Sequence, residues 1–353
     1  MPLPHLDIPT AAPHASTTMA KTHARVNVTP NGEADLSYDL LIPKDWAYSK
    51  QFGPTVTGLM QTQGLGFFAS SVDPDGPVIA ATVSTIPFEV PIDSWARVAL
   101  AQDGWIIIAG RWFPGPYGLI YDVTAVRERE QTWQVRRTSV RVRGTQVFSL
   151  NCMCSEVHWN LWKETFWVAH LSFELTTKGS SRMEPWMGGI GEHPPFQFGY
   201  PASWTAETKA TEEGGTSAVD VRLLNRQGDT LQAYLQVVAR HRKPGEAAPI
   251  LALHEREAYG LLEQAGLQPE APPRQLTLAE DPRSEAVPGW LGSLECEGLM
   301  QGGRVYTRTG FMDRAGTTFT FTLIGPLLAD DALTYLRAQR AFEIARASLV
   351  TPQ

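Results

Sequence analysis

The sequence predicts an α+β fold that is built twice, as two tandem domains that each form a mainly antiparallel sheet covered by helices. Three observations support this prediction. An apolar run that ends in Pro-x-x-Trp occurs at Leu40–Trp46 and again at Phe198–Trp204. A Pro-Gly turn at Pro114 returns at Pro288, and alternating strand-like sequence and a closing helix follow each turn. Landmarks that recur in the same order are typical of a duplicated domain.

The two predicted closing helices agree in detail. Apolar residues in the first, over 155–175, recur at the spacing of one helical stripe, and the second, over 330–350, repeats the pattern 176 positions later. Such a stripe predicts the face that packs on the sheet. The paired positions are Trp159, Trp162, Phe166, Ala169 and Phe173 in the first helix and Tyr335, Ala338, Phe342, Ala345 and Leu349 in the second.

The order of elements follows from alternation and from proline. A strand over 36–42 ends at Pro43, which cannot donate to a central ladder. The second copy is expected to contain a helix over 249–265 and alternating strands over 292–323. The remaining elements of the first copy are a strand at 78–86, a helix at 92–100 and three antiparallel strands at 118–126, 131–143 and 145–154.

Length and composition set the domain organisation. A chain of 353 residues suits two cores of ordinary size. We expect a flexible N-terminal tail at 1–33, a first domain at 34–175, a linker at 176–195 and a second domain at 196–353. The expected tail and linker are rich in small, polar and proline residues without a hydrophobic period, which is typical of segments that lack a core.

Charge, cysteine content and apolar runs limit the class of protein. The formal charge of −7 argues against a nucleic-acid binder, and the apolar runs are too short to span a membrane. The first thirty residues show no signal-peptide pattern, so we expect a cytoplasmic protein. The three cysteines do not make a disulfide framework and have no partners at metal-ligand spacing. We therefore expect buried cysteines, no metal and no cofactor.

The entry strand with Pro-x-x-Trp, the mid-domain helix, the strand meander and the long closing helix together resemble the PsbP-like fold, here in tandem. Members of that fold include the PsbP proteins of photosystem II, a Ran-GTPase-binding protein, the DcrB lipoproteins and the Eag chaperones of type VI secretion. The residues that carry the resemblance are Pro43 and Trp46, Pro201 and Trp204, and the turns at Pro114 and Pro288.

The resemblance implies a non-enzymatic binding scaffold. The Eag chaperones are similar in setting, being cytoplasmic and bacterial, and they work as pairs of domains, which a tandem chain would provide covalently. The resemblance therefore implies an adaptor or chaperone whose partner is a protein, such as a secreted effector or a secretion component. A small-molecule or lipid-binding protein with a tryptophan-lined pocket is the alternative hypothesis.

Tryptophan is distributed unevenly between the copies. Nine of the 11 tryptophans precede the second copy, and several stand where the second copy has no aromatic counterpart. Tryptophan is enriched at interaction hot spots, so these surplus residues are candidate partner contacts. The candidates are Trp105, Trp112, Trp133 and Trp167.

The first closing helix carries a second apolar stripe opposite its core stripe. This stripe contains Val157, Leu161, Val168 and Leu171, with Trp167 alongside, whereas the second helix has Arg337 where the first has Leu161. A helix that is apolar nearly all round needs burial on both sides. Packing between the copies or under the linker is the structural explanation. The functional explanation is a partner-binding face formed by Leu161, Trp167 and Leu171.

A row of arginines marks the middle strand of the meander. Strand alternation places Arg141 and Arg143 on one face and Val140 and Val142 on the other. Together with Arg137, these arginines predict a basic stripe on the solvent side. A solvated face with cross-strand ion pairs is the usual explanation of such a stripe, and a site for phosphate or an acidic partner is the alternative.

The sequence contains no recognisable catalytic constellation. No serine lies in a nucleophile elbow, and His158 and His170 are too far apart on one helix to share a metal. The glycine-rich stretches lack the residues that would complete a dinucleotide or phosphate loop. We therefore expect a protein that is not an enzyme.

Overall fold

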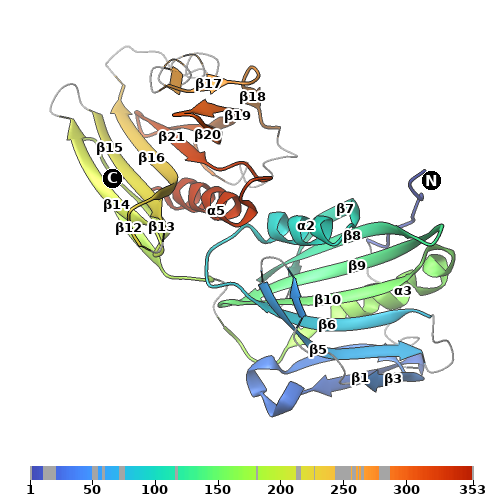
Figure 1. Cartoon of the computed structure of the whole chain (residues 1–353). Helices are drawn as coiled ribbons and strands as arrows, with labels where there is room; N and C mark the ends of the chain where they lie inside the picture. The colour runs from blue at the N-terminus through green and yellow to red at the C-terminus, as the bar shows by residue number, and fades with distance from the viewer. Residues whose placement is uncertain are drawn as a thin grey trace. The chain divides into compact units, whose positions relative to one another are not determined.

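In the computed structural model the chain forms two compact units, and each is described by itself (Figure 1). Unit 1 contains Met1–Pro87 and Ile92–Met183, and unit 2 contains Phe88–Pro91 and Glu184–Gln353. The structure describes residues 2–10, 21–49, 55–57, 60–70, 76–115, 118–179, 182–211, 216–225, 227–242, 256, 260, 262–263, 266–277 and 287–351.

Unit 1 has a large antiparallel sheet with strand order β3-β5-β6-β10-β9-β8-β7, in which β4 also pairs with β5. A three-stranded sheet, β1-β2-β11, accompanies it. The elements of unit 1 are β1 His23–Val28, the 3-10 turns Pro30–Gly32 and Ala34–Leu36, β2 Tyr38–Pro43, β3 Trp46–Ser49, β4 Thr55–Thr57, β5 Met60–Ser70, β6 Val78–Thr85, α2 Ile92–Gln102, β7 Ile106–Gly115, β8 Gly118–Arg129, β9 Thr132–Arg143, β10 Gln146–Ser155, α3 Glu156–Ser172 and β11 Glu174–Leu175.

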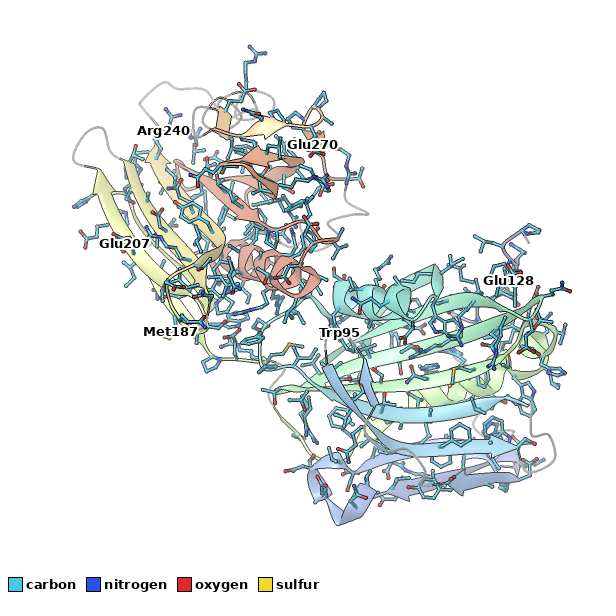
Figure 2. The ribbon with its side chains drawn as sticks, viewed as in Figure 1. Trp95, Glu128, Met187, Glu207, Arg240 and Glu270 are labelled. Atoms are coloured by element: carbon cyan, nitrogen blue, oxygen red, sulfur yellow. The ribbon has the colours of Figure 1, made fainter. Side chains whose placement is uncertain are left out.

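The helices α2 and α3 contact opposite faces of this sheet. Tyr121 and Asp122 are neighbours on β8, so their side chains point to opposite faces. Arg97 of α2 donates to the Tyr121 hydroxyl at 2.9 Å. Arg137, which pairs with Asp122, lies 4.3 Å from the ring of Trp167 on α3. Figure 2 labels Trp95, the buried tryptophan of α2.

Unit 2 repeats this architecture. Its large antiparallel sheet has the order β14-β15-β16-β21-β20-β19-β17, with β18 paired to β19, and β12 pairs with β13 in a small sheet. The helix α5 follows the last strand, as α3 follows β10. The elements of unit 2 are β12 Trp186–Glu192, β13 Pro195–Pro201, β14 Thr205–Thr211, β15 Thr216–Leu224, β16 Leu231–His241, β17 Gln268–Pro269, β18 Arg274–Gln275, β19 Trp290–Met300, β20 Gly303–Arg314, β21 Thr317–Gly325 and α5 Ala332–Ser348.

The strand pairings of the two large sheets correspond residue by residue. The turn that joins β20 to β21 lies 171 positions after the turn that joins β9 to β10. The same offset pairs Arg137 with Arg308. Both arginines are buried, and each lies over an aromatic ring of its closing helix, 4.3 Å from Trp167 and 4.6 Å from Phe342. The two units therefore repeat a packing detail as well as a strand order.

Both cores contain the helical stripes that the sequence predicts. Trp46 and Trp204, the tryptophans of the Pro-x-x-Trp runs, are also buried, at 7% and 3% exposure. The stripe residues buried in the two cores are Trp159, Phe166, Ala169 and Phe173 in unit 1 and Ala338, Phe342, Ala345 and Leu349 in unit 2, with Trp162 and Tyr335 partly buried beside them.

The structure departs from the sequence predictions in three places. His23–Val28, within the expected flexible tail, form β1 because they pair with β2. Trp186–Glu192, within the expected linker, form β12 because they pair with β13. Coverage of the sheets by helices is only partial, since α2, α3 and α5 are the long helices of the described residues. The helix expected over 249–265 lies largely outside those residues.

Candidate functional site

The closing helix of unit 1, α3, presents the candidate site. It begins after Ser155, with Glu156 in its first turn, where a negative charge interacts favourably with the helix dipole. At its end the N–H of Phe173 donates to the carbonyl of Ala169 at 2.9 Å. The ring of Phe173 packs edge-on against Tyr38, with 5.3 Å between centroids. The inner side of α3 is therefore fixed by contacts within unit 1.

The opposite side of α3 carries exposed apolar residues, although Val168, which belongs to the same stripe, is buried at 4% exposure. Val157, Leu161 and Leu171 are 82%, 70% and 40% exposed, and the exposed Glu164 lies one turn after Leu161. We call the surface of these four residues the outer face of α3. A large aliphatic side chain that stays in water forgoes about 1.5–3 kcal/mol of burial free energy. This surface therefore carries a free-energy cost that binding would offset.

Trp167 does not belong to the outer face. It is 3% exposed and lies beneath two guanidinium groups, 4.7 Å from that of Arg111 and 4.3 Å from that of Arg137. The ring of Phe113 packs edge-on against it, at 5.6 Å. Helical spacing predicts that Trp167 lies near Leu161 and Leu171 on the surface of the helix. In the structure, however, side chains of strands β7 and β9 cover it. The predicted partner-binding residues are thus separated into an interior tryptophan and two exposed leucines.

A short segment contacts the same side of α5 in unit 2. Arg337 occupies the position of Leu161, 176 residues later, and Arg340 occupies the position of Glu164. The guanidinium of Arg337 lies 3.9 Å from the centroid of the Phe88 ring. The sequence alone gave no indication of this contact, because Phe88 lies between β6 and α2 of unit 1 along the chain.

Glu89 anchors this segment, Phe88–Pro91, within unit 2. Its carboxylate pairs with Arg340 Nε at 3.0 Å and accepts from Trp186 Nε1 at 3.1 Å. The backbone N–H of Glu89 donates to the carboxylate of Glu184 at 2.9 Å. Glu89 is only 2% exposed, so these charge-assisted hydrogen bonds are shielded from water.

The predicted basic stripe lies inside unit 1 and not on its surface. Arg137, Arg141 and Arg143 do share one face of β9, but they are only 0%, 7% and 9% exposed. Strand β9 lies between β8 and β10, and this face packs beneath α3. Arg141 donates to the backbone carbonyl of His170 in α3 at 2.9 Å, and Arg143 lies over the ring of Phe148. The prediction that the stripe faces solvent is therefore wrong.

Asp122 neutralises the most buried of these arginines. Its carboxylate accepts from Arg137 Nε at 3.0 Å and Nη2 at 2.7 Å, and from Arg111 Nε at 3.1 Å. Burial by itself raises the pKa of Asp122, but the hydrogen bond and the charge of Arg137 outweigh it and lower that pKa below its usual value. One buried carboxylate thus holds two guanidinium groups beside Trp167.

Residues 2–10 also contact this part of unit 1. The backbone carbonyl of Pro9 accepts from the Nη2 atoms of both arginines that bind Asp122, at 3.0 Å each. The indole N–H of Trp159 donates to the backbone carbonyl of Asp7 at 3.0 Å, and the Asp7 carboxylate pairs with Lys163. These residues, within the expected flexible tail, are therefore held by side chains of the sheet and of α3.

The other candidate tryptophans lie apart from one another. Trp105 is 4% exposed and lies 4.5 Å from the guanidinium of Arg127. Trp133 is 6% exposed and belongs to the core beneath α3, whereas the partly buried Trp112 packs on Tyr121 at the opposite face of the sheet. Among the described residues, these tryptophans do not line a common pocket or surface.

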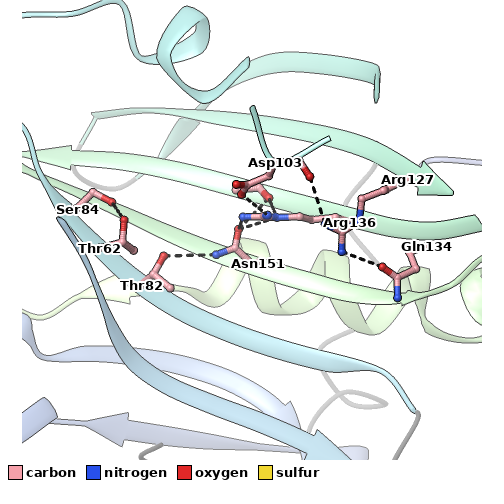
Figure 3. Close-up of polar contacts among 9 residues, drawn as sticks. Thr62, Thr82, Ser84, Asp103, Arg127, Gln134, Arg136 and Asn151 are labelled. Atoms are coloured by element: carbon pink, nitrogen blue, oxygen red, sulfur yellow. Dashed lines mark hydrogen bonds and ion pairs between the residues drawn. The ribbon is translucent and has the colours of Figure 1, made fainter. Parts of the chain in front are cut away.

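The face of the sheet opposite α3 carries a row of polar contacts (Figure 3). Arg136 donates to the Asn151 side chain at 2.7 Å, and Asn151 donates to the Thr82 hydroxyl at 3.4 Å. Asp103, just after α2, lies 3.9 Å from Arg136. These contacts join β6, β10 and β9 to one another and to the turn after α2, so we assign them a structural role.

Within the part of the chain that the structure describes, no group of three or more His, Cys, Asp or Glu side chains is arranged to hold a metal ion. None of the helices found there combines the length and the apolar character that a membrane span requires. All three cysteines are buried and unpaired with one another.

Known proteins were compared with the chain at the level of sequence and of structure. Neither the models of known protein families nor the curated proteins give a match. Among solved structures, cyanobacterial PsbP (CyanoP) from Synechocystis sp. PCC 6803 is similar with 14% identity and a TM-score of 0.34, covering 50% of this chain and 99% of that one.

Two other solved structures are similar at the same level. LpqN, involved in cell envelope biogenesis of Mycobacterium tuberculosis, has 13% identity and a TM-score of 0.31, covering 44% of this chain and 92% of that one. TplEi, an immunity protein of the type VI secretion system from Pseudomonas aeruginosa, has 11% identity and a TM-score of 0.25, covering 94% and 98%.

Proposed function

We propose that this chain is a non-enzymatic, cytoplasmic protein-binding protein, an adaptor or chaperone, and that the outer face of α3 contacts its partner. The exposure of Val157, Leu161 and Leu171, on a helix whose inner face already packs in a core, carries this proposal. An exposed apolar stripe favours a protein partner because binding would remove it from water.

The contrast between the two units supports the proposal. The positions of Val157, Leu161 and Leu171 are occupied in α5 by Leu333, Arg337 and Ala347, of which Leu333 and Arg337 are partly buried. In unit 2, moreover, Phe88–Pro91 contact this side of the helix. Equivalent faces of two related helices thus differ, since that of α5 carries arginines contacted by Phe88 and Glu89 while that of α3 carries exposed apolar side chains.

For the scaffold we propose two tandem PsbP-like domains. The repeated strand order and the Pro-x-x-Trp entry strands support this assignment. The resemblance to the Eag chaperones suggests a type VI secretion effector, or a component of a secretion apparatus, as the partner. An apolar stripe on one helix can bind an effector or a secretion component equally well. In either case binding buries apolar side chains and requires no reaction of the partner.

We expect Leu161→Arg to abolish partner binding while leaving the fold intact. The substitution places a charge in the middle of the apolar stripe, yet Leu161 is 70% exposed, so the free energy of unfolding should change by no more than about 0.5 kcal/mol. The measurement is photo-cross-linking in the native cell from a photoreactive residue at Asn160, with the adduct detected by mass spectrometry.

The matched control is Leu119→Arg, which introduces the same change at a 65% exposed leucine elsewhere in unit 1. The control should keep the adduct that Leu161→Arg loses. An adduct that survives Leu161→Arg, or that both substitutions remove equally, would contradict a partner site on the outer face of α3.

A further inference from the structure

Unit 2 shows how a closing helix of this fold holds a short segment. Phe88 and Glu89 are adjacent in sequence and contact helix residues three apart, Arg337 and Arg340. The aromatic ring lies against the first guanidinium, and the carboxylate pairs with the second. Val90, the next residue, is 2% exposed. Recognition by the helix here therefore combines an aromatic ring and an ion pair from two consecutive residues, and the residue that follows them is buried.

The helix α3 presents the same two positions with different chemistry. Leu161 corresponds to Arg337, and Glu164 corresponds to Arg340. Leucine still offers a surface on which a ring can pack, but glutamate inverts the charge at the ion-pair position. The neighbouring cation, Lys163, is paired with Asp7. A segment that binds α3 in the same manner must therefore carry a positive charge where Glu89 carries a negative one.

We propose that the outer face of α3 binds a short non-helical segment of a partner protein, in which an aromatic or large aliphatic residue is followed directly by lysine or arginine. The apolar side chain packs on Leu161, and the basic side chain pairs with Glu164. Val157 extends the apolar surface one turn before Leu161, and the exposed Leu171 lies beyond Glu164 and the buried Val168, so the flanking residues are apolar as well. This inference rests on the proposed function, because it names the chemistry of the partner at that same face.

The two contacts contribute differently to binding. Burial of the apolar side chain supplies most of the affinity. A solvent-exposed ion pair contributes little by itself, which corresponds to a few-fold change in the dissociation constant. The basic residue therefore sets the preference among apolar segments, and the test is a comparison of matched peptides rather than a single affinity.

The probes are two fluorescent heptapeptides added to the full-length chain. One has the chain's own sequence over residues 86–92, Ile-Pro-Phe-Glu-Val-Pro-Ile, and the other has lysine in place of the glutamate. Fluorescence anisotropy should show that the lysine peptide binds at least about threefold more tightly. A benzophenone in place of its phenyl ring should cross-link to residues 157–171. Equal binding of the two peptides, or the absence of adducts from α3, would overturn the inference.

Charge reversal at the helix provides the decisive comparison. Glu164→Lys should invert the preference, so that the glutamate peptide binds α3 more tightly than the lysine peptide. Glu33→Lys makes the same change in net charge at an exposed position elsewhere in unit 1 and should leave the preference unchanged. If the Glu164→Lys chain still prefers the lysine peptide, Glu164 does not determine which peptide binds.

The outcomes separate this inference from the proposed function. If Leu161→Arg removes the cellular adduct but the peptides are not discriminated, the outer face binds a partner of other chemistry and only the present inference fails. If Leu161→Arg leaves the cellular adduct in place, the proposed function itself fails.

Discussion

Replacing Asp122 with alanine is expected to destabilise unit 1 by about 3–5 kcal/mol. The substitution removes the carboxylate that accepts two hydrogen bonds from Arg137, whose side chain is 0% exposed. The guanidinium would then remain charged in the interior, where its Nη2 still donates to the carbonyl of Pro9. Because proteins are stabilised by only about 5–15 kcal/mol in total, unit 1 should unfold in mild denaturant.

Tryptophan fluorescence during urea unfolding measures this effect, since eight of the 11 tryptophans belong to unit 1. The double variant Asp122→Leu with Arg137→Met tests the cause. It replaces the buried pair with apolar side chains and should recover most of the lost stability. If Asp122→Ala unfolds at the same urea concentration as the parent chain, the pair is not desolvated as the structure has it.

The strand order and the closing helices could be predicted from the sequence because their signals are local. Prolines end strands, glycine turns join them, and the spacing of Trp159, Phe166 and Phe173 defines a single helical stripe. The repeat of this pattern at Phe342 then gave the correspondence between helices that the structure displays. The strands β1 and β12 were missed because their pairing with β2 and β13 does not depend on a pattern within the segments themselves.

The position of the arginines could not be predicted in the same way. Alternation showed that Arg137 and Arg141 share a face of β9, but it does not tell which face is inside. We expected the charged face outside because charged residues are seldom buried unless they are paired. The pairing is with Asp122, on the neighbouring strand and 15 residues away. The recurrence of an arginine at the corresponding position, Arg308, was the available signal of an interior role.

Half of the candidate site was predicted and half was not. The sequence identified Val157, Leu161, Val168 and Leu171 as apolar positions outside the core stripe, and all of them except Val168 are exposed. It grouped Trp167 with them because helical spacing describes neighbours on the helix and not what lies against them. The contact of Phe88 with α5 had no sequence signal at all, since it depends on where the chain runs after β6.

His170 is expected to make the stability of unit 1 depend on pH. The ring is completely buried, and its pKa is lowered to about 3, chiefly by burial; Arg137 and Arg141 also lower the pKa, while the charge of Asp122 acts in the opposite direction. A histidine in the unfolded chain titrates near 6.5. Below about pH 6.5 the unfolded state therefore binds a proton that the folded state does not bind, and the free energy of unfolding should fall by about 1.4 kcal/mol per pH unit as the pH decreases towards 3.

The variant His170→Leu should flatten this dependence, because it removes the group that titrates differently in the two states. The comparison is best made between about pH 6 and 4.5, since the carboxylate of Asp122, with its lowered pKa, stays charged there in the folded protein. His158→Leu, at a partly buried position on the same helix, is the matched control for the loss of an imidazole from α3. If the free energy of unfolding depends on pH equally in the parent chain and in His170→Leu, the ring reaches water and becomes charged in the folded protein. The packing around this end of α3 then does not exclude solvent.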